Sequence, residues 1–168
     1  WDGVSKSEPA TDDAQNRYII KSAANIAWLC ENASTLDENK TFILTTDIDM
    51  NGKQLKSISL PAGSTIDGGE HTIKGLNLSG ALFGDATNLT VESLNLEDII
   101  VGNNTHAGVL VNTLKGSSSF TNVSIKSSSV TTTGGAAGGM VGYIVRATEK
   151  DRTETLSVSF SGCKLNSV

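Results

Sequence analysis

Two aspartates and an asparagine at alternate positions are the first residues of this chain whose types and spacing suggest chemistry. Asp47, Asp49 and Asn51, followed by Gly52, form the pattern D-x-D-x-N-G. This pattern opens a calcium-binding loop, because a hard cation takes oxygen ligands from alternate positions. The position where such a loop places its bidentate carboxylate holds Ile58 instead. The alternative interpretation is a strand and a turn, with the carboxylates outward and the apolar residues between them inward.

A second group of residues with catalytic potential lies about 20 positions further along. Asp67, Glu70 and His71 offer two carboxyl groups and an imidazole. They would serve as general acid and base on a polysaccharide if they lay on one open face together with Asp47. The alternative is a tight turn after Asp67, in which the histidine flanks the next strand. His106 has no Cys or second His near it in the sequence, which favours a turn residue over a metal ligand.

Other signatures of enzymes and binding sites are weak. The sequence has no Ser-His-Asp spacing, phosphate-binding loop or dinucleotide fingerprint, so we assign no catalytic residue. Hydroxyl-rich runs at 117–119, 127–129 and 131–133 would either contact a glycan or form outward strand faces. With an aromatic content of 5%, no stacking platform for sugars is obvious. Cys30 and Cys163 lack metal-ligand spacing, and we expect apolar packing rather than a disulfide.

Composition limits the class of protein. The chain has 168 residues, a net charge of −5 and 38% hydrophobic residues. The acidic balance disfavours a nucleic acid partner, because the phosphate backbone is negative. No apolar run approaches the roughly 18 residues that a membrane-spanning helix needs. The apolar residues alternate with polar ones, which is typical of strands and not of disorder.

Internal repetition indicates which fold must position these side chains. Three pentapeptides share a leading glycine: GALFG at 80–84, GVLVN at 108–112 and GGMVG at 138–142. A second apolar motif follows each copy, beginning at Leu94, Val123 and Cys163. A charged insertion at 146–155, expected as an exposed loop, explains the longer last step. Repeats of about 30 residues predict a parallel β-helix, a solenoid in which equivalent residues stack and Cys163 faces inward. A two-layer sandwich would not need such repeats.

The segment before the repeats differs from them. Residues 1–17 are polar and are predicted to form an arm. Residues 18–20 are predicted to be extended. A helix is predicted over 23–33, with Ser22 as its N-cap. Its apolar face, at Ala23, Ile26, Ala27 and Cys30, would cover the open end of the solenoid. We therefore expect one domain, with an arm and capping helix at 1–40 and β-helix coils at 41–168.

Several stretches together resemble the GLUG-repeat proteins of bacterial surfaces. They are YII at 18–20 with the helix after it, FILTTDIDMNG at 42–52, TIDGGEHTIKGL at 65–76, and the three pentapeptides. The resemblance implies a right-handed β-helix on exported, surface-attached or adhesin-like proteins, with no common catalytic site. The chain departs from the pattern at Asn112, where the closing glycine is missing, and at the insertion.

The leading expectation is a secreted or cell-surface, non-catalytic module for adhesion, which binds glycans or host or bacterial surface proteins. The alternatives are a carbohydrate-active enzyme, either a polysaccharide lyase or a hydrolase, and a structural spacer. No cofactor is expected apart from the calcium hypothesis. The last repeat-like strand, near Val168, has no visible cap. This predicts further coils or another domain after it, or a partner or second copy that covers it.

Overall fold

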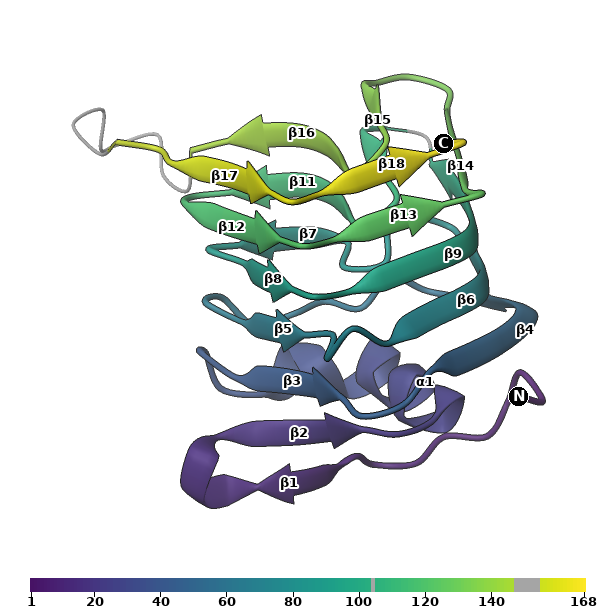
Figure 1. Ribbon diagram of the computed structural model, residues 1–168, viewed down its shortest axis with the longest axis vertical. Helices are drawn as coiled ribbons and strands as arrows, with labels where there is room; N and C mark the ends of the chain where they lie inside the picture. Colours follow the sequence, from purple (N-terminus) through teal and green to yellow (C-terminus); the bar gives the residue numbers. More distant parts are fainter. Residues whose placement is uncertain (104, 147–154) are drawn as a thin grey trace.

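The structure, a computed structural model, describes residues 1–103, 105–146 and 155–168. In these residues the chain is mostly β, with parallel sheets and one α-helix near the N-terminus (Figure 1). The fold class predicted from the sequence is confirmed at this level. The predicted charged insertion at 146–155 lies almost entirely outside the described residues.

The chain begins with an antiparallel pair of strands. β1 (Ala10–Asp12) pairs with β2 (Arg17–Ile20) across a short 3-10 turn (Asp13–Gln15). Asn16 closes that turn in the left-handed conformation, with φ of 56°. The extended segment predicted at 18–20 is therefore confirmed as part of β2.

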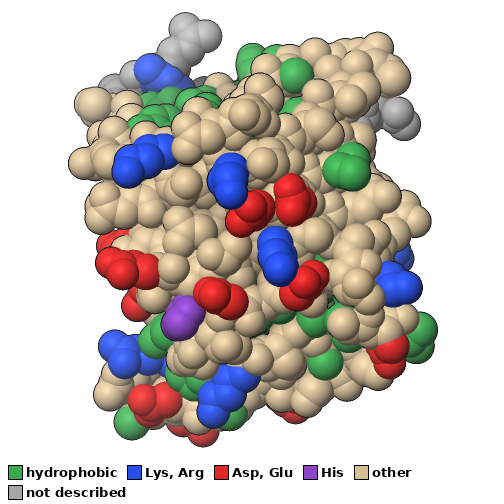
Figure 2. Space-filling view, turned by 45° about the vertical axis from the view of Figure 1, so that its right-hand side comes forward, with side chains coloured by type: hydrophobic (Ala, Val, Ile, Leu, Met, Phe, Trp, Pro, Cys, Tyr) green, Lys and Arg blue, Asp and Glu red, His purple; other side chains and the backbone are tan. Residues whose placement is uncertain are grey.

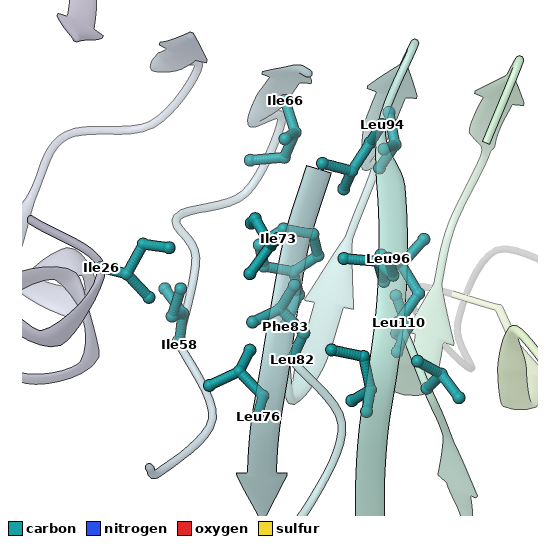
Figure 3. Close-up of a cluster of buried hydrophobic side chains, with 14 of the residues drawn as sticks. Ile26, Ile58, Ile66, Ile73, Leu76, Leu82, Phe83, Leu94, Leu96 and Leu110 are labelled. Atoms are coloured by element: carbon teal, nitrogen blue, oxygen red, sulfur yellow. The ribbon is translucent and has the colours of Figure 1, made fainter. Parts of the chain in front are cut away.

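The predicted helix is also present, as α1 (Ala23–Asn32), and it continues into a 3-10 turn (Ala33–Thr35). Ser22 is its N-cap, because the Ser22 hydroxyl accepts a hydrogen bond from the Asn25 backbone N–H at 3.3 Å. Ile26 on the inner face of α1 is buried and lies beside Ile58 in the core (Figure 3). Cys30, predicted on the same face, is partly buried, and burial raises the pKa of its thiol to about 12.

A seven-stranded sheet runs along the molecule in the order β1-β2-β3-β5-β8-β12-β17. From β2 onward every pairing in it is parallel. Its later strands are β3 (Thr41–Leu44), β5 (Thr65–Asp67), β8 (Thr90–Glu92), β12 (Ser118–Thr121) and β17 (Val158–Ser161).

The second parallel sheet has six strands. After most strands of the seven-stranded sheet, the next strand along the chain belongs to this second sheet. Its order is β18-β13-β9-β6-β4, and β14 also pairs with β9. The strands are β4 (Ile48–Leu55), β6 (Thr72–Leu78), β9 (Asn95–Asn103), β13 (Ser124–Lys126), β14 (Ser129–Thr132) and β18 (Lys164–Asn166).

Two smaller parallel sheets complete the structure. One has three strands in the order β16-β11-β7: β7 (Asp85–Thr87), β11 (Val111–Lys115) and β16 (Val141–Val145). The other pairs β10 (Ala107–Gly108) with β15 (Ala137–Gly138).

The strand register follows the repeats found in the sequence. Gly108 pairs with Gly138, the leading glycines of two pentapeptides. Ser124 pairs with Asn95 on one side and with Lys164 on the other, which aligns the second motif as predicted. Cys163 is therefore equivalent to the buried Val123, although Cys163 itself is only partly buried.

Left-handed residues occupy one corner of the structure, where the chain passes from the seven-stranded to the six-stranded sheet. Glu70, Ser93, Asn122 and Gly162 hold equivalent places there, with φ of 64°, 50°, 54° and 64°. Asn and Gly adopt this conformation readily, which explains Asn122 and Gly162, whereas Glu70 and Ser93 are less usual in it. The backbone continues the ladder through the corner, since the Ser93 N–H donates to the Thr121 carbonyl at 2.9 Å.

The core lies between the sheets and receives alternating side chains from strands such as β3, β5 and β13. In the six-stranded sheet Ile48, Ile73, Leu96 and Ile125 follow one another in register, and all are at most 3% exposed. Figure 3 shows Ile73 and Leu96 pointing into the same cluster as Leu82 and Phe83, from the first pentapeptide. The alternation leaves the intervening residues of the strands on the outer face.

Candidate functional site

The outer face of the six-stranded sheet carries a row of alternating charges. Asp49, Lys74, Glu97 and Lys126, the charged row, face outward in register on β4, β6, β9 and β13. Lys74 Nζ lies 3.2 Å from Asp49 Oδ2, and Lys126 Nζ lies 2.8 Å from Glu97 Oε1. Figure 2 shows acidic and basic side chains side by side over this face. Exposed ion pairs of this kind add little to the free energy of folding. The main effect of the charged row is to give this face both carboxylate and ammonium groups.

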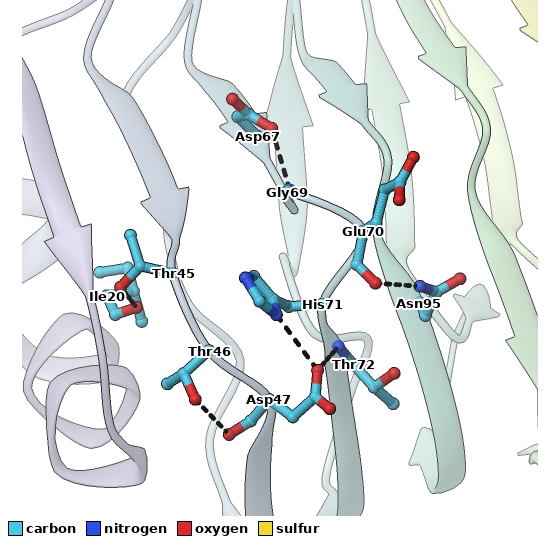
Figure 4. Close-up of polar contacts among 10 residues, drawn as sticks. All are labelled: Ile20, Thr45, Thr46, Asp47, Asp67, Gly69, Glu70, His71, Thr72 and Asn95. Carbon is cyan, nitrogen blue, oxygen red and sulfur yellow. Dashed lines mark hydrogen bonds and ion pairs between the residues drawn. The ribbon is translucent and has the colours of Figure 1, made fainter.

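A second row of uncharged and basic residues runs beside the first. Thr72, Asn95, Ser124 and Lys164, the polar row, are paired in register on β6, β9, β13 and β18. The Asn95 side-chain amide donates to the Glu70 carbonyl at 2.7 Å, which anchors it against the corner (Figure 4). The two rows give the face hydroxyl, amide, carboxylate and ammonium groups within a few strands.

Asp47 lies just before β4 and is held against β6. Its Oδ1 accepts a hydrogen bond from the Thr72 backbone N–H at 2.9 Å and lies 3.3 Å from His71 Nδ1 (Figure 4). The Thr72 N–H is the main reason why the pKa of Asp47 is below its ordinary value, since it stabilises the ionised form. Asp47 is therefore a fixed, ionised carboxylate at neutral pH.

Asp49 is held in a similar way at the beginning of the charged row. Its Oδ1 accepts a hydrogen bond from the Asn51 backbone N–H at 2.8 Å, and its Oδ2 contacts Lys74. The Asn51 N–H lowers the pKa of Asp49, and the hydrogen bond from Lys74 lowers it further. Asn51 itself is exposed in a left-handed turn, with φ of 56°.

These contacts bear on the calcium hypothesis for Asp47, Asp49 and Asn51. The two aspartates lie outward with buried Ile48 between them, as the strand-and-turn interpretation predicts. The carboxylate oxygens of the two aspartates are only partly available to a cation. Oδ1 of each already accepts a backbone N–H, and Lys74 contacts Asp49 Oδ2. In the described part of the chain, no three His, Cys, Asp or Glu side chains gather as metal ligands. Calcium binding here stays a prediction.

Two adjoining hollows meet at Asp47 and Asp49. One, of about 300 Å³, is lined by Trp1 and by the first turn of α1, and we call it the Trp1 hollow. The other, of about 410 Å³, is lined by Thr72, Lys74 and Glu97, and we call it the ladder hollow. Trp1 and two ionised aspartates thus border one continuous stretch of surface.

Sequence reasoning missed this position of Trp1. The Asn51 side-chain amide donates to the Trp1 carbonyl at 3.4 Å, and the two residues are 50 positions apart. The Trp1 indole N–H donates to the Ser5 carbonyl at 2.9 Å, which orients the ring. No local pattern indicates that residue 1 reaches β4; the only available signal was an indole in an otherwise polar arm.

A third hollow, the corner groove, follows the left-handed corner. It has a volume of about 440 Å³ and is lined by Glu70, Ser93, Asn95, Asn122, Ser124, Gly162 and Lys164. Within the described ranges neither Glu70 nor Lys164 forms an ion pair. The groove therefore offers a carboxylate and an ammonium at its two ends, with hydroxyl and amide groups between them.

The second group of candidates, Asp67, Glu70 and His71, does not come together as an acid–base set. Asp67 Oδ1 accepts the Gly69 N–H at 3.0 Å, which makes the tight turn that the sequence suggested. Glu70 lines the corner groove, whereas His71 turns towards Asp47. Figure 4 shows the carboxylates of Asp47, Asp67 and Glu70 pointing away from one another.

The remaining candidates, His106 and the hydroxyl-rich runs, make contacts within the fold. His106 Nδ1 accepts a hydrogen bond from the Ala136 N–H at 3.0 Å, and its ring stacks on Tyr143 at a centroid distance of 4.3 Å. The hydroxyl-rich runs are not wholly outward, because Ser118 and Ser128 in the first two runs are buried. Their hydroxyls accept backbone N–H groups of Leu89 and Ile99, so they are unavailable to a ligand.

Two wider results complete the description of the site. Across the residues that the structure describes, no helix has the length and apolar character to cross a bilayer. In comparisons of the chain with known proteins, no family model, no curated protein and no solved structure matches it.

Proposed function

We propose that the chain is a right-handed parallel β-helix, closed at one end by α1, of the type carried by GLUG-repeat surface proteins. The support is the alternation of the chain between two parallel sheets, with partners one repeat apart in register. Parallel strands joined by crossovers are right-handed in almost all proteins, which sets the proposed hand. The resemblance at 18–20, 42–52 and 65–76 supports a secreted or cell-surface location.

On this scaffold we propose a non-catalytic adhesion function, in which the outer face of the six-stranded sheet binds a glycan. The observation that carries the proposal is that Trp1 lines the same hollow as the ionised Asp47 and Asp49. An indole packs against the apolar C–H face of a sugar ring, and carboxylates accept hydrogen bonds from its hydroxyls. The divergent directions of Asp47, Asp67 and Glu70 favour binding over hydrolysis.

The charged row indicates what kind of glycan would bind. Asp49 is paired with Lys74, and Glu97 with Lys126, so positive and negative charges alternate along the face. A strongly acidic glycan would meet carboxylates at Asp47, Asp49 and Glu97 and be repelled. We therefore expect a neutral glycan with several free hydroxyl groups, lying across the Trp1 hollow and the ladder hollow.

A glycan-array screen of the purified chain, with calcium and with a chelator, tests the proposal. We expect selective binding of neutral glycans, and about fivefold weaker binding by Trp1→Ala, because a stacking contact of about 1 kcal/mol is lost. Asp49→Asn should weaken binding as well. Val4→Ala, in the same arm and 76% exposed, is the matched control and should bind like the parent.

The outcomes separate the possibilities. Binding that disappears with the chelator would support calcium at Asp47, Asp49 and Asn51. A blank array would overturn the glycan proposal and favour binding of a surface protein, or a spacer role. Binding that Trp1→Ala leaves unchanged would move the site away from the Trp1 hollow, and the corner groove would be the next region to mutate.

A further inference from the structure

The corner groove is a hollow of its own, separate from the proposed glycan site. Neither the Trp1 hollow nor the ladder hollow shares a lining residue with it. Its volume of about 440 Å³ lies within the range of about 300–1,000 Å³ that is usual for small-ligand sites. The groove therefore has room for a ligand other than the glycan.

Two columns of residues form the groove, and both run along the stack of strands. The first is the left-handed corner, from Glu70 to Gly162, and the second is the polar row, from Asn95 to Lys164. Glu70 precedes β6 and Gly162 precedes β18, and these strands are three places apart in the six-stranded sheet. At a strand spacing of about 4.8 Å, the groove is about 14 Å long.

Opposite charges mark the two ends of the groove. Glu70 lies at the end near β6, and Lys164 lies at the end near β18. Among the residues that the structure describes, neither the Glu70 carboxylate nor the Lys164 ammonium has a hydrogen bond or an ion pair. The two lysines of the charged row, by contrast, are each paired with a carboxylate. The groove thus presents one carboxylate and one ammonium that a ligand can neutralise.

The groups between these charges are amides and hydroxyls. The backbone beneath them is satisfied within the ladder, since the Asn122 N–H donates to the Ser161 carbonyl at 2.8 Å and the Ser124 N–H donates to the Leu94 carbonyl at 2.9 Å. The side chains are therefore what a ligand meets. A side-chain amide both donates and accepts hydrogen bonds, as a peptide bond does. None of the described lining residues is aromatic, so the groove has no ring on which a sugar would stack.

Glu70 occupies a backbone conformation that does not favour a glutamate. Its φ is 64°, and the equivalent places further along the corner hold Asn122 and Gly162, which adopt this conformation readily. The backbone therefore gives no reason for a glutamate at this corner. A carboxylate at the end of a ligand groove does give one.

We propose that the corner groove binds a short, extended peptide with free termini. The N-terminal ammonium of the peptide pairs with Glu70, and its C-terminal carboxylate pairs with Lys164. An extended residue spans about 3.3–3.6 Å, so about four residues bridge the two charged ends. The peptide bonds between the termini exchange hydrogen bonds with the side chains of Asn122 and Ser124.

Titration of the ¹⁵N-labelled chain with tetra-alanine, followed by NMR, tests the proposal. We expect saturable shifts of the Asn122 side-chain amide signals and of the Ser124 backbone signal. N-acetylated and C-amidated tetra-alanine each lack one terminal charge. Each should bind about fivefold more weakly, because one exposed ion pair is lost. Dialanine, which is too short to reach both charges, should also bind more weakly than tetra-alanine.

Reversing the charges at the two ends gives a sharper test. Glu70→Lys and Lys164→Glu each leave two like charges in the groove, and each should weaken the binding of tetra-alanine about fivefold or more. The double variant again has opposite charges and should recover binding, with the peptide lying in the reverse direction. Glu38→Lys and Lys21→Glu make the same changes at exposed positions outside the groove and should bind like the parent. The amide spectrum of each variant checks that the fold is retained.

Three results would overturn the proposal. They are the absence of a saturable shift with tetra-alanine, capped peptides that bind as tightly as the free one, and single charge-reversal variants that bind like the parent. A neutral oligosaccharide that shifts the Asn122 and Ser124 signals where tetra-alanine does not would assign the groove to glycan binding instead.

Discussion

The hydroxyl of Ser128 accepts a hydrogen bond from the backbone N–H of Ile99 at 3.1 Å, although the two residues are 29 positions apart. The same hydroxyl donates to the Lys126 carbonyl at 2.9 Å. Ser118 makes the corresponding contact with the Leu89 N–H at 3.0 Å, again 29 positions away. In both places a buried serine satisfies a backbone donor of the preceding repeat, where the strand ladder leaves it without a carbonyl partner.

Replacing Ser128 with alanine should destabilise the protein by about 1–3 kcal/mol, because the buried Ile99 N–H would lose its acceptor. Ser129→Ala is the matched control, since Ser129 is the next residue and is exposed; its effect should be within about 0.5 kcal/mol. Urea unfolding followed by circular dichroism measures both. Equal stability of the two variants would mean that water replaces the hydroxyl.

Ile99 and Ile100 are neighbours in β9 with opposite orientations, and their exposed fractions are 0% and 55%. Ile99→Ala should reduce the free energy of unfolding by about 2–5 kcal/mol, through lost burial and the cavity left behind. Ile100→Ala should change it by about 0.5 kcal/mol or less. Chemical unfolding of the pair checks the inward and outward assignment of this strand, and similar losses would contradict it.

Gly68 lies where the chain turns towards the six-stranded sheet. The surrounding backbone leaves no room for a side chain at this position. A Cβ at this position would lie 2.4 Å from the Ser93 carbonyl oxygen and 2.5 Å from Leu94 Cα. Both are backbone atoms of the next repeat, so Gly68→Ala should destabilise the protein by about 1–3 kcal/mol through overpacking. Gly102→Ala is the control, because a Cβ there has nothing within 4 Å. Thermal unfolding should show a lower Tm for the first variant alone.

The carboxylate of Asp47 should make stability depend on pH in acid. Its pKa in the folded protein lies below the ordinary value of 3.8, mainly because of the Thr72 N–H. Its ionised form therefore contributes stability that is present above pH 3.8 and is lost as the pH falls through the folded pKa. Asp47→Asn should make the fall of Tm below pH 4 shallower than in the parent.

Glu38→Gln provides the control for this titration, since Glu38 is exposed and its carboxylate has no hydrogen bond or ion pair within the described ranges. Its Tm should follow the parent curve throughout the acid range. A parent-like acid slope for Asp47→Asn as well would mean that other carboxylates govern acid unfolding, with Asp49 the first to examine, because its pKa is also lowered.

The sequence by itself determined the local structure of several segments and, around β4, which side chains face inward. Ser22 and the apolar spacing after it predicted α1, because capping and helical periodicity are properties of contiguous residues. The alternation around Asp47 and Asp49 predicted an outward pair of carboxylates beside a buried Ile48, because strand side chains have a period of two. The pentapeptides predicted which residues pair, since equivalent positions of similar repeats align in register.

Only the tertiary structure decided which distant residues share a surface. Trp1 meets β4 across 50 positions because the N-terminal arm reaches that strand, and Ser128 meets Ile99 across 29 because stacked parallel strands bring them together. Local sequence cannot show such contacts, since they depend on the lengths and turns of all the segments between. For the same reason, a run of three serines gave no sign that Ser128 is buried, and the apolar character of Phe160 gave no sign of its exposure. Burial is set by the neighbouring layer of strands, not by the residue itself.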